Sequence, residues 1–161
     1  MKNIIIRQMN KDEEYLLEEF IYQAIFQREG EPLLPRSIIK EPTIDVFIKD
    51  FGKPDDNCLV AEIDGKVVGS VWTRILNNEI KGFGNVDDST PEFAISILPE
   101  YRGGGIGTKL MIAMLVLLKA KGYSQASLAV QKDNYAEKMY HSVGFEIVRT
   151  TDKEYIMIAK L

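Results

Sequence analysis

The spacing of apolar positions changes several times along this chain, and each change predicts a different kind of element. Residues 4–6 are three consecutive isoleucines, a run typical of a short buried strand. Asn10 and Glu13 have the spacing of a capping box, and the apolar residues after them recur at helical intervals up to Ile25. Residues 29–53 mix prolines with short apolar groups, which predicts loop and broken helix, and we place acceptor recognition in this segment.

The middle of the chain has the pattern of strands. Residues 58–63 and 66–76 flank Asp64-Gly65, a dipeptide that accepts the positive φ angles of a tight hairpin turn. After a polar, glycine-rich loop, residues 93–98 form a further strand. Pro99 ends that strand because proline cannot donate a hydrogen bond to a ladder.

The last third predicts a helix, a strand, a short helix and two strands. The long helix covers residues 106–121, and Gly122 suits its end. The strand at 126–130 must return parallel to the strand at 93–98, because a helical crossover joins them. The remaining elements are expected at 134–142, 145–150 and 155–159. We therefore expect one α/β (α+β) domain over residues 1–161, with a mixed, mostly antiparallel sheet of six or seven strands, a parallel pair in the middle and about four flanking helices.

Composition agrees with a compact domain. The chain has 161 residues, of which 45% are apolar and 27% charged. Its longest uninterrupted apolar stretch, residues 110–118, is far shorter than the roughly 20 residues that cross a bilayer. The isoleucines at the N-terminus are too short a run for a secretory signal, so we expect a cytoplasmic protein without membrane contact.

Charge and single residues exclude several other classes. Residues 1–60 hold 12 acidic and 8 basic residues, whereas residues 61–161 hold 12 of each. This acidic excess disfavours a nucleic-acid surface and would attract a cationic acceptor, unless it is only the solvated face of a helix. Cys58 is the only cysteine and His141 the only histidine, so we expect no disulfide and no metal site. Cys58 fits a half-buried strand residue, and His141 a surface residue.

A glycine-rich segment lies where a strand has ended and a helix begins. Its residues are Arg102, Gly103, Gly104, Gly105, Ile106, Gly107 and Thr108. Unpaired main-chain N–H groups of such a segment point out of one concavity, where glycines allow close approach and the helix dipole favours an anion. The segment therefore predicts a pyrophosphate site, with a merely flexible loop as the alternative. A P-loop needs a lysine after Gly107, and a dinucleotide fingerprint needs an acid on the next strand, and this chain has neither.

Two blocks of the sequence resemble a known family. Arg102-x-x-Gly105-x-Gly107 is similar to the Arg/Gln-x-x-Gly-x-Gly/Ala motif of the GNAT superfamily of N-acetyltransferases, and Leu98-Pro99-Glu100-Tyr101 precedes it as in that family. A second block resembles the superfamily's strand, short helix and turn through Val130, Asn134, Ala136, Tyr140, Gly144 and Phe145. Gly104 departs from the family, which often has a basic residue there. The resemblance covers residues 58–161, whereas residues 1–57 match only as a strand and a helix.

The resemblance implies a co-substrate and the residues that hold it. In this superfamily the parallel strands splay apart, and the pantetheine arm of acetyl-CoA pairs with the exposed main chain. Main-chain groups of Ile95, Ser96 and Ile97 would hold the pantetheine and the acetyl carbonyl, and Asn134 would bind from the opposite side. A structural role for the two isoleucines in the core is compatible with this one.

The chemistry of amines requires proton transfer. An alkyl amine has a pKa of about 10.4, so it is mostly protonated at neutral pH. Glu92, at the start of the strand, resembles a family position that acts as base through water, and Tyr140 resembles the residue that protonates the departing thiolate. An N–H near Ile97 would stabilise charge on the thioester oxygen. The alternatives are an exposed acid for Glu92 and a packed tyrosine for Tyr140.

These observations predict an N-acetyltransferase that moves an acetyl group from acetyl-CoA to a primary amine, a small cationic molecule, in a ternary complex. A protein N-terminal or lysine acetyltransferase is an alternative within the enzymes. A non-catalytic acyl-CoA-binding or sensing module is the alternative outside them, and it would need neither Tyr140 nor Glu92. Dimerisation is common in the superfamily, and the terminal strands leave a homodimer open.

Overall fold

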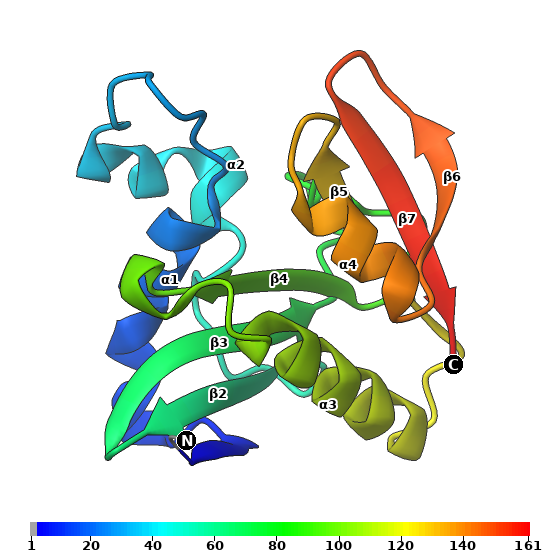
Figure 1. Cartoon of the computed structure of the whole chain (residues 1–161). Helices are drawn as coiled ribbons and strands as arrows, with labels where there is room; N and C mark the ends of the chain where they lie inside the picture. Colours follow the sequence, from blue (N-terminus) through cyan, green and yellow to red (C-terminus); the bar gives the residue numbers. More distant parts are fainter. Residues whose placement is uncertain (1–2) are drawn as a thin grey trace.

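A mixed sheet of seven strands runs through residues 3–161, the part of the chain that this computed structural model describes (Figure 1). Its order is β1-β2-β3-β4-β5-β7-β6. The strands are β1 (Ile4–Gln8), β2 (Asn57–Ile63), β3 (Lys66–Arg74), β4 (Glu92–Ile97), β5 (Gln125–Gln131), β6 (Glu146–Thr150) and β7 (Glu154–Lys160). Only β4 and β5 pair in parallel; the other neighbours are antiparallel. The predicted mixed sheet with a central parallel pair is confirmed.

Four α-helices flank the sheet in the described part of the chain. They are α1 (Leu17–Ala24), α2 (Pro42–Asp45), α3 (Ile106–Ala120) and α4 (Ala136–Ser142). Three 3-10 helices accompany them: η1 (Lys11–Leu16), η2 (Arg36–Lys40) and η3 (Pro99–Tyr101). The predicted first helix therefore begins as a 3-10 helix. The Asn10 N–H donates to Glu13 Oε1 at 2.8 Å, and this hydrogen bond is one half of the expected capping box. None of these helices is long and apolar enough to span a membrane, as far as residues 3–161 are concerned.

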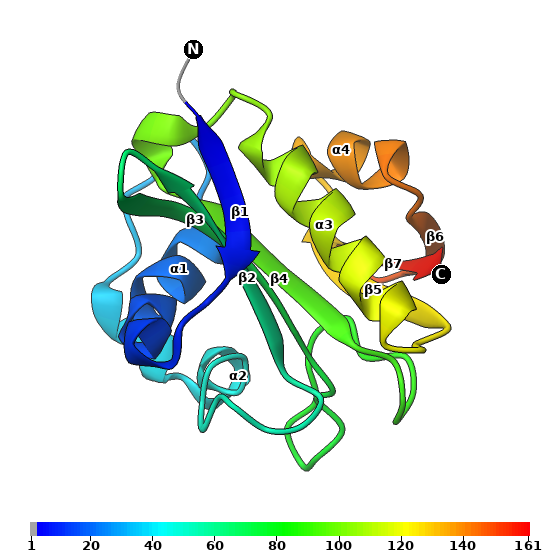
Figure 2. The ribbon, with the colours of Figure 1, turned by 90° about the horizontal axis from the view of Figure 1, so that it is seen from below.

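The central strand β3 is buried on both faces, and this explains the two cores. Successive side chains of a strand point to opposite faces, so Val71 and Trp72 belong to different clusters, although both are fully buried. Leu110 and Met114 of α3 pack on the face of Val71, and Phe20 of α1 packs on the face of Trp72. Figure 2 shows α1 and α3 on opposite sides of the sheet.

The hairpin between β2 and β3 forms as predicted. Asp64 and Gly65 have φ angles of 50° and 81°, which are the positive values that this kind of tight turn requires. Some predicted bounds shift by a few residues. The strand expected at 93–98 begins at Glu92, and the helix expected from 134 begins at Ala136, because the Asn134 side chain accepts the Ala136 N–H at 2.9 Å and so lies in the cap.

The parallel pair in the middle of the sheet is open. Glu92 of β4 and Ser127 of β5 are its one paired position among the described residues, and the Ser127 N–H donates to Pro91 O at 2.9 Å. Beyond it the two strands diverge, and Figure 1 shows the wedge between them. The Leu98 N–H donates to Val68 O of β3. Because backbone groups alternate sides along a strand, those of Ile95 and Ile97 face the wedge.

Candidate active site

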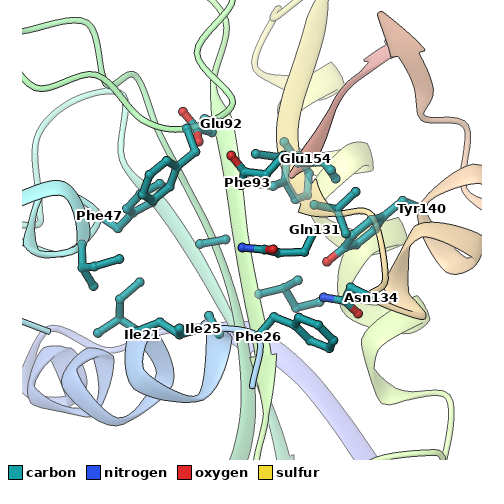
Figure 3. Close-up of a pocket in the computed structure, with 18 of the residues that line it drawn as sticks. Ile21, Ile25, Phe26, Phe47, Glu92, Phe93, Gln131, Asn134, Tyr140 and Glu154 are labelled. Atoms are coloured by element: carbon teal, nitrogen blue, oxygen red, sulfur yellow. The ribbon is translucent and has the colours of Figure 1, made fainter. Parts of the chain in front are cut away.

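Two cavities meet in the wedge. The larger, which we call the groove, has a volume of about 830 Å³ and runs from the glycine-rich segment along β4 to α4. The smaller, the inner pocket, has a volume of about 370 Å³ and lies between α1, α2, β4 and β5 (Figure 3). Residues common to both walls include Phe26, Ile95, Asn134 and Tyr140. A ligand in the groove would therefore end beside a ligand in the inner pocket.

The glycine-rich segment has the backbone of an anion site. Gly103 and Gly105 both have φ of 83°, in the left-handed region, and Gly105 caps α3. The first hydrogen bond of the helix runs from the Lys109 N–H to Gly105 O, so the N–H groups of Ile106, Gly107 and Thr108 have no acceptor within the helix. A Cβ added at Gly103 or Gly105 would meet nothing within 4 Å, so the concavity is open. Together with the helix dipole, these groups suit a phosphate.

Arg102 is fixed at the end of β4. Its Nε donates to Ile97 O at 2.9 Å, and its Nη2 donates to Gln23 Oε1 at 3.1 Å. The side chain thus ties the end of β4 to the end of α1 while it lines the groove. Its charge adds positive potential to the groove.

The three predicted residues of β4 are placed differently from one another. Ile95 and Ile97 line the groove and turn their main-chain groups toward the wedge. Ser96 also borders the groove, but its buried hydroxyl donates to Phe20 O at 2.7 Å, and its main chain faces β3. Ser96 therefore holds α1 against the sheet. Across the wedge, Asn134 uses its Oδ1 in the cap of α4, and its Nδ2 is left for the cavity (Figure 3).

Glu92 is buried on the wall of the inner pocket, with 3% of its surface exposed. The Gly84 N–H donates to its Oε2 at 2.8 Å, and its Oε1 has no hydrogen-bond partner anywhere in residues 3–161. Burial is the largest cause that raises the pKa of Glu92, the Gly84 N–H opposes it and the nearby Glu154 adds to it, and together they bring the pKa to about 7. The carboxyl group can therefore take up and release a proton near neutral pH.

Tyr140 lies on α4 where the two cavities meet. It is 9% exposed and packs against Phe145, with ring centroids 6.2 Å apart. Burial raises the pKa of Tyr140 to about 12, so the phenol stays protonated at neutral pH and can act only as a proton donor there. The geometry thus places a group able to accept a proton and a group able to donate one on the walls of one cavity.

Sequence reasoning missed Glu154 and the loop that buries Glu92. Glu154 begins β7, lines the inner pocket, and has its pKa raised by burial. Gly82 lets the loop pass Glu92, because a Cβ there would lie 1.9 Å from Glu92 Oε1. Gly84 is needed as well, since its Cβ would lie 2.6 Å from the Leu128 carbonyl carbon. The two glycines around Phe83 were the signal that could have revealed this loop.

His141 and Cys58 lie away from the reaction geometry. The His141 Nε2 contacts Glu137 Oε2 at 2.9 Å on the outside of α4, and the ring is partly exposed. Cys58 is buried in β2, and burial raises the pKa of its thiol to about 12, which removes nucleophilic reactivity at neutral pH. No group of three potential metal-ligating side chains occurs in the described part of the chain.

Comparisons with known proteins agree with this geometry. The model of the acetyltransferase (GNAT) family matches residues 18–145, and the chain therefore belongs to this family. A mycothiol acetyltransferase of Saccharomonospora viridis is 34% identical over 98 residues, which are 60% of this chain and 31% of that protein. A [ribosomal protein bS18]-alanine N-acetyltransferase of Haemophilus influenzae is 39% identical over 77 residues, 46% of this chain and 53% of that protein. The chain thus spans about a third to a half of the length of these relatives.

The fold is shared with solved structures. The PaiA N-acetyltransferase of Thermoplasma acidophilum, crystallised with coenzyme A, superposes with a TM-score of 0.69 at 21% identity and covers 99% of both chains. At this identity the likeness concerns the fold.

Proposed function

We propose that this protein is an acetyl-CoA-dependent N-acetyltransferase that acetylates a small primary amine by direct attack in a ternary complex. One observation carries the proposal: the wedge between β4 and β5 joins a groove with an anion site at one end to a pocket that buries Glu92. The groove suits a long, phosphate-bearing molecule, and the pocket suits its acceptor.

The walls of the groove fit acetyl-CoA from end to end. The N–H groups of residues 103–108 would bind its diphosphate, and Arg102 would add positive potential. Main-chain groups of Ile95 and Ile97 would pair with the pantetheine arm as a neighbouring strand does, with Asn134 Nδ2 as donor on the opposite wall. Ser96 would keep β4 and α1 in place. Acetyl-CoA supplies the acetyl thioester.

Glu92 and Tyr140 would manage the protons. The amine enters as an ammonium ion, and Glu92, directly or through a water molecule, removes a proton from it so that its lone pair becomes free to attack. The Ile97 N–H, which faces the wedge, would donate to the acetyl carbonyl oxygen. Tyr140 would donate its proton to the departing thiolate sulfur, and the second proton that the amine nitrogen loses as the amide forms would restore the phenol. Proton acceptor and donor are then separate groups: near pH 7 a part of the Glu92 population is ionised and can accept a proton, while Tyr140 is protonated and can donate one.

A module that only binds acyl-CoA would use the groove without proton transfer. It would gain nothing from a buried carboxyl group with an unpaired oxygen, which costs free energy in any folded protein. Glu92 therefore favours catalysis over sensing.

The test combines binding with turnover. We expect calorimetry to detect binding of CoA, and release of free thiol from acetyl-CoA to depend on an added amine. Absence of heat from CoA and its acyl esters at high protein concentration would overturn the assignment. Strong thermal stabilisation by acetyl-CoA, without thiol release for any amine, would instead support a sensing module.

A further inference from the structure

We propose that the acceptor is a monoamine whose single amino group is attached to a compact apolar body, such as an arylalkylamine or a short branched alkylamine. This inference rests on the proposed function and names its substrate class. It depends on the walls, charges and size of the inner pocket, none of which the family assignment determines.

Apolar side chains form most of the remaining wall of the inner pocket. They come from the end of α1, from the region of α2 and from the loop before β4, and they include Ile21, Ile25, Phe26, Ile44, Phe47 and Phe83. The rings of Phe47 and Phe83 are stacked, with centroids 6.1 Å apart. In Figure 3 the labelled members of this set lie below and to the left of the cavity. Such a wall binds a hydrocarbon body, because it removes apolar surface from water.

A bridge holds Phe26 in this wall. The Arg28 guanidinium lies 5.2 Å from the centre of the Phe26 ring and binds Asp133 at 2.7 and 3.0 Å. It also donates to Gln131 Oε1 at 3.2 Å. The loop after α1 is thereby tied to the loop after β5 across the wedge, which keeps an aromatic ring at the junction of pocket and groove.

The negative charge of the pocket is concentrated on one side. Of the described residues that line it, Glu92 and Glu154 carry carboxyl groups, and both lie at the top of Figure 3; Lys153, next to Glu154 in the chain, is the cationic residue of the lining. One ammonium group can approach these carboxyls. A second ammonium on the same molecule would lie against the rest of the wall, which is mostly apolar. Among the described lining residues this part has the amides of Gln131 and Asn134 but no further carboxyl group, so burial of the second charge would be costly.

The acidic excess of residues 1–60 does not change this conclusion, because two of its central members are engaged outside the pocket. Glu13 binds Arg7 at 2.8 Å, and this contact lowers the pKa of Glu13 to about 2. Glu19 binds Arg36 at 2.8 Å. Neither acid lines the inner pocket. No acid of the described residues 3–60 lines the inner pocket, although Glu29 and Glu31 line the groove, so the excess adds no second carboxyl site for a polyamine inside the inner pocket.

The size of the pocket limits the body of the acceptor. A volume of about 370 Å³ is near the low end of ligand sites and equals that of roughly a dozen water molecules. A phenyl or branched alkyl group with a short amino arm fits this volume. A peptide would bring main-chain amides that the apolar wall leaves unpaired.

The experiment compares acceptors of different classes at saturating acetyl-CoA. Free-thiol release gives kcat/KM for 2-phenylethylamine, isoamylamine, spermidine and a lysine-free tripeptide with a free N-terminus. We expect 2-phenylethylamine to exceed spermidine and the tripeptide by about a hundredfold or more, as burial of unpaired polar groups predicts. Phe83→Ala should raise KM for 2-phenylethylamine about tenfold without changing CoA affinity. Tyr15→Ala, which truncates an aromatic ring that is 72% exposed and outside both cavities, should change neither.

The outcomes separate the two proposals. Faster turnover of spermidine or the tripeptide overturns the monoamine assignment and leaves the acetyltransferase intact. Thiol release with none of the amines overturns the acetyltransferase. In that case calorimetry of 2-phenylethylamine with the CoA-loaded protein tests whether the inner pocket binds an apolar amine. Binding heat in the wild type that is lost in Phe83→Ala supports such a site, and absence of binding heat in the wild type overturns it.

Discussion

Replacement of Glu92 by glutamine tests the role of this residue through two independent measurements. The amide keeps the shape of the side chain and an oxygen for the Gly84 N–H, but it cannot take a proton from an ammonium ion. If Glu92 is the base, kcat/KM of the wild type rises with pH through an inflection near pH 7, where the pKa of Glu92 lies. The variant should lose this inflection and about 10²–10⁴ in rate.

The same pKa predicts a change in stability. The pKa of Glu92 is raised from 4.5 to about 7 in the folded chain, a difference that corresponds to about 3 kcal/mol. Because the folded state holds the proton more tightly, this stabilisation is complete below about pH 4.5 and is lost as the pH rises through about 7. Glutamine stays neutral throughout. The variant should therefore match the wild type near pH 4.5 and exceed its unfolding free energy by up to about 3 kcal/mol at pH 8.

Urea unfolding at several pH values and the pH dependence of acetyl transfer provide the two measurements. A variant that is stabilised at pH 8 but keeps the wild-type rate profile would show a buried carboxyl group that is not the base. A variant that loses rate without any pH-dependent gain in stability would contradict the raised pKa. If neither quantity changes, the reasoning about this residue is refuted.

Four further changes test the remaining parts of the site and the fold. Tyr140→Phe should lower kcat by about 10² or more and leave the Kd of acetyl-CoA unchanged, and unaltered turnover in the same assay would remove its role as acid. Glu154→Gln removes a charge that raises the pKa of Glu92, so the inflection of the rate profile should move to lower pH; a fixed inflection would show that the two groups are uncoupled. Gly105→Ala puts a side chain at φ of 83° and should weaken CoA binding about tenfold by calorimetry. Gly122→Ala, at φ of 93° beyond the other end of α3, is the matched control for backbone strain; equal affinities of the two variants would contradict the anion site. Asp56→Ala leaves the buried Arg74 guanidinium without its carboxylate partner. The free energy of unfolding should fall by about 3–5 kcal/mol, which corresponds to roughly 10 °C in Tm; a fall of less than about 2 °C would show that the salt bridge is replaceable.

Local patterns predicted the elements well. The strands and α3 follow periods of two and 3.6 residues, which a short window of sequence contains, and most of their bounds differ from the structure by one or two residues. The glycine-rich segment could be located for the same reason, because its left-handed glycines and the start of α3 are neighbours in sequence. Tyr140 and Asn134 came from a second local block, and the structure brings them to the wall opposite Ile95.

The inner pocket could not be predicted, because distant segments build it. Phe47, Phe83 and Glu154 belong to three segments that become neighbours only through the sheet. The burial of Glu92 depends on the loop around Gly84. The residues next to Glu92 alone could therefore not distinguish an exposed acid from a base with a raised pKa. Acceptor recognition was expected in residues 29–53, which supply only part of the pocket wall.

The single paired position between β4 and β5 also has a mechanical consequence. It divides the sheet into two parts, β1–β4 and β5–β7, which pair with each other only at Glu92 and Ser127 among the described residues. The helix α3 connects the two parts through the chain, and the salt bridge between Arg28 and Asp133 connects them across the wedge. A molecule that pairs with the exposed main chain in the wedge would supply the missing hydrogen bonds and fix the spacing of the two parts. Its release would require those hydrogen bonds to break, so product release would be coupled to the opening of the wedge.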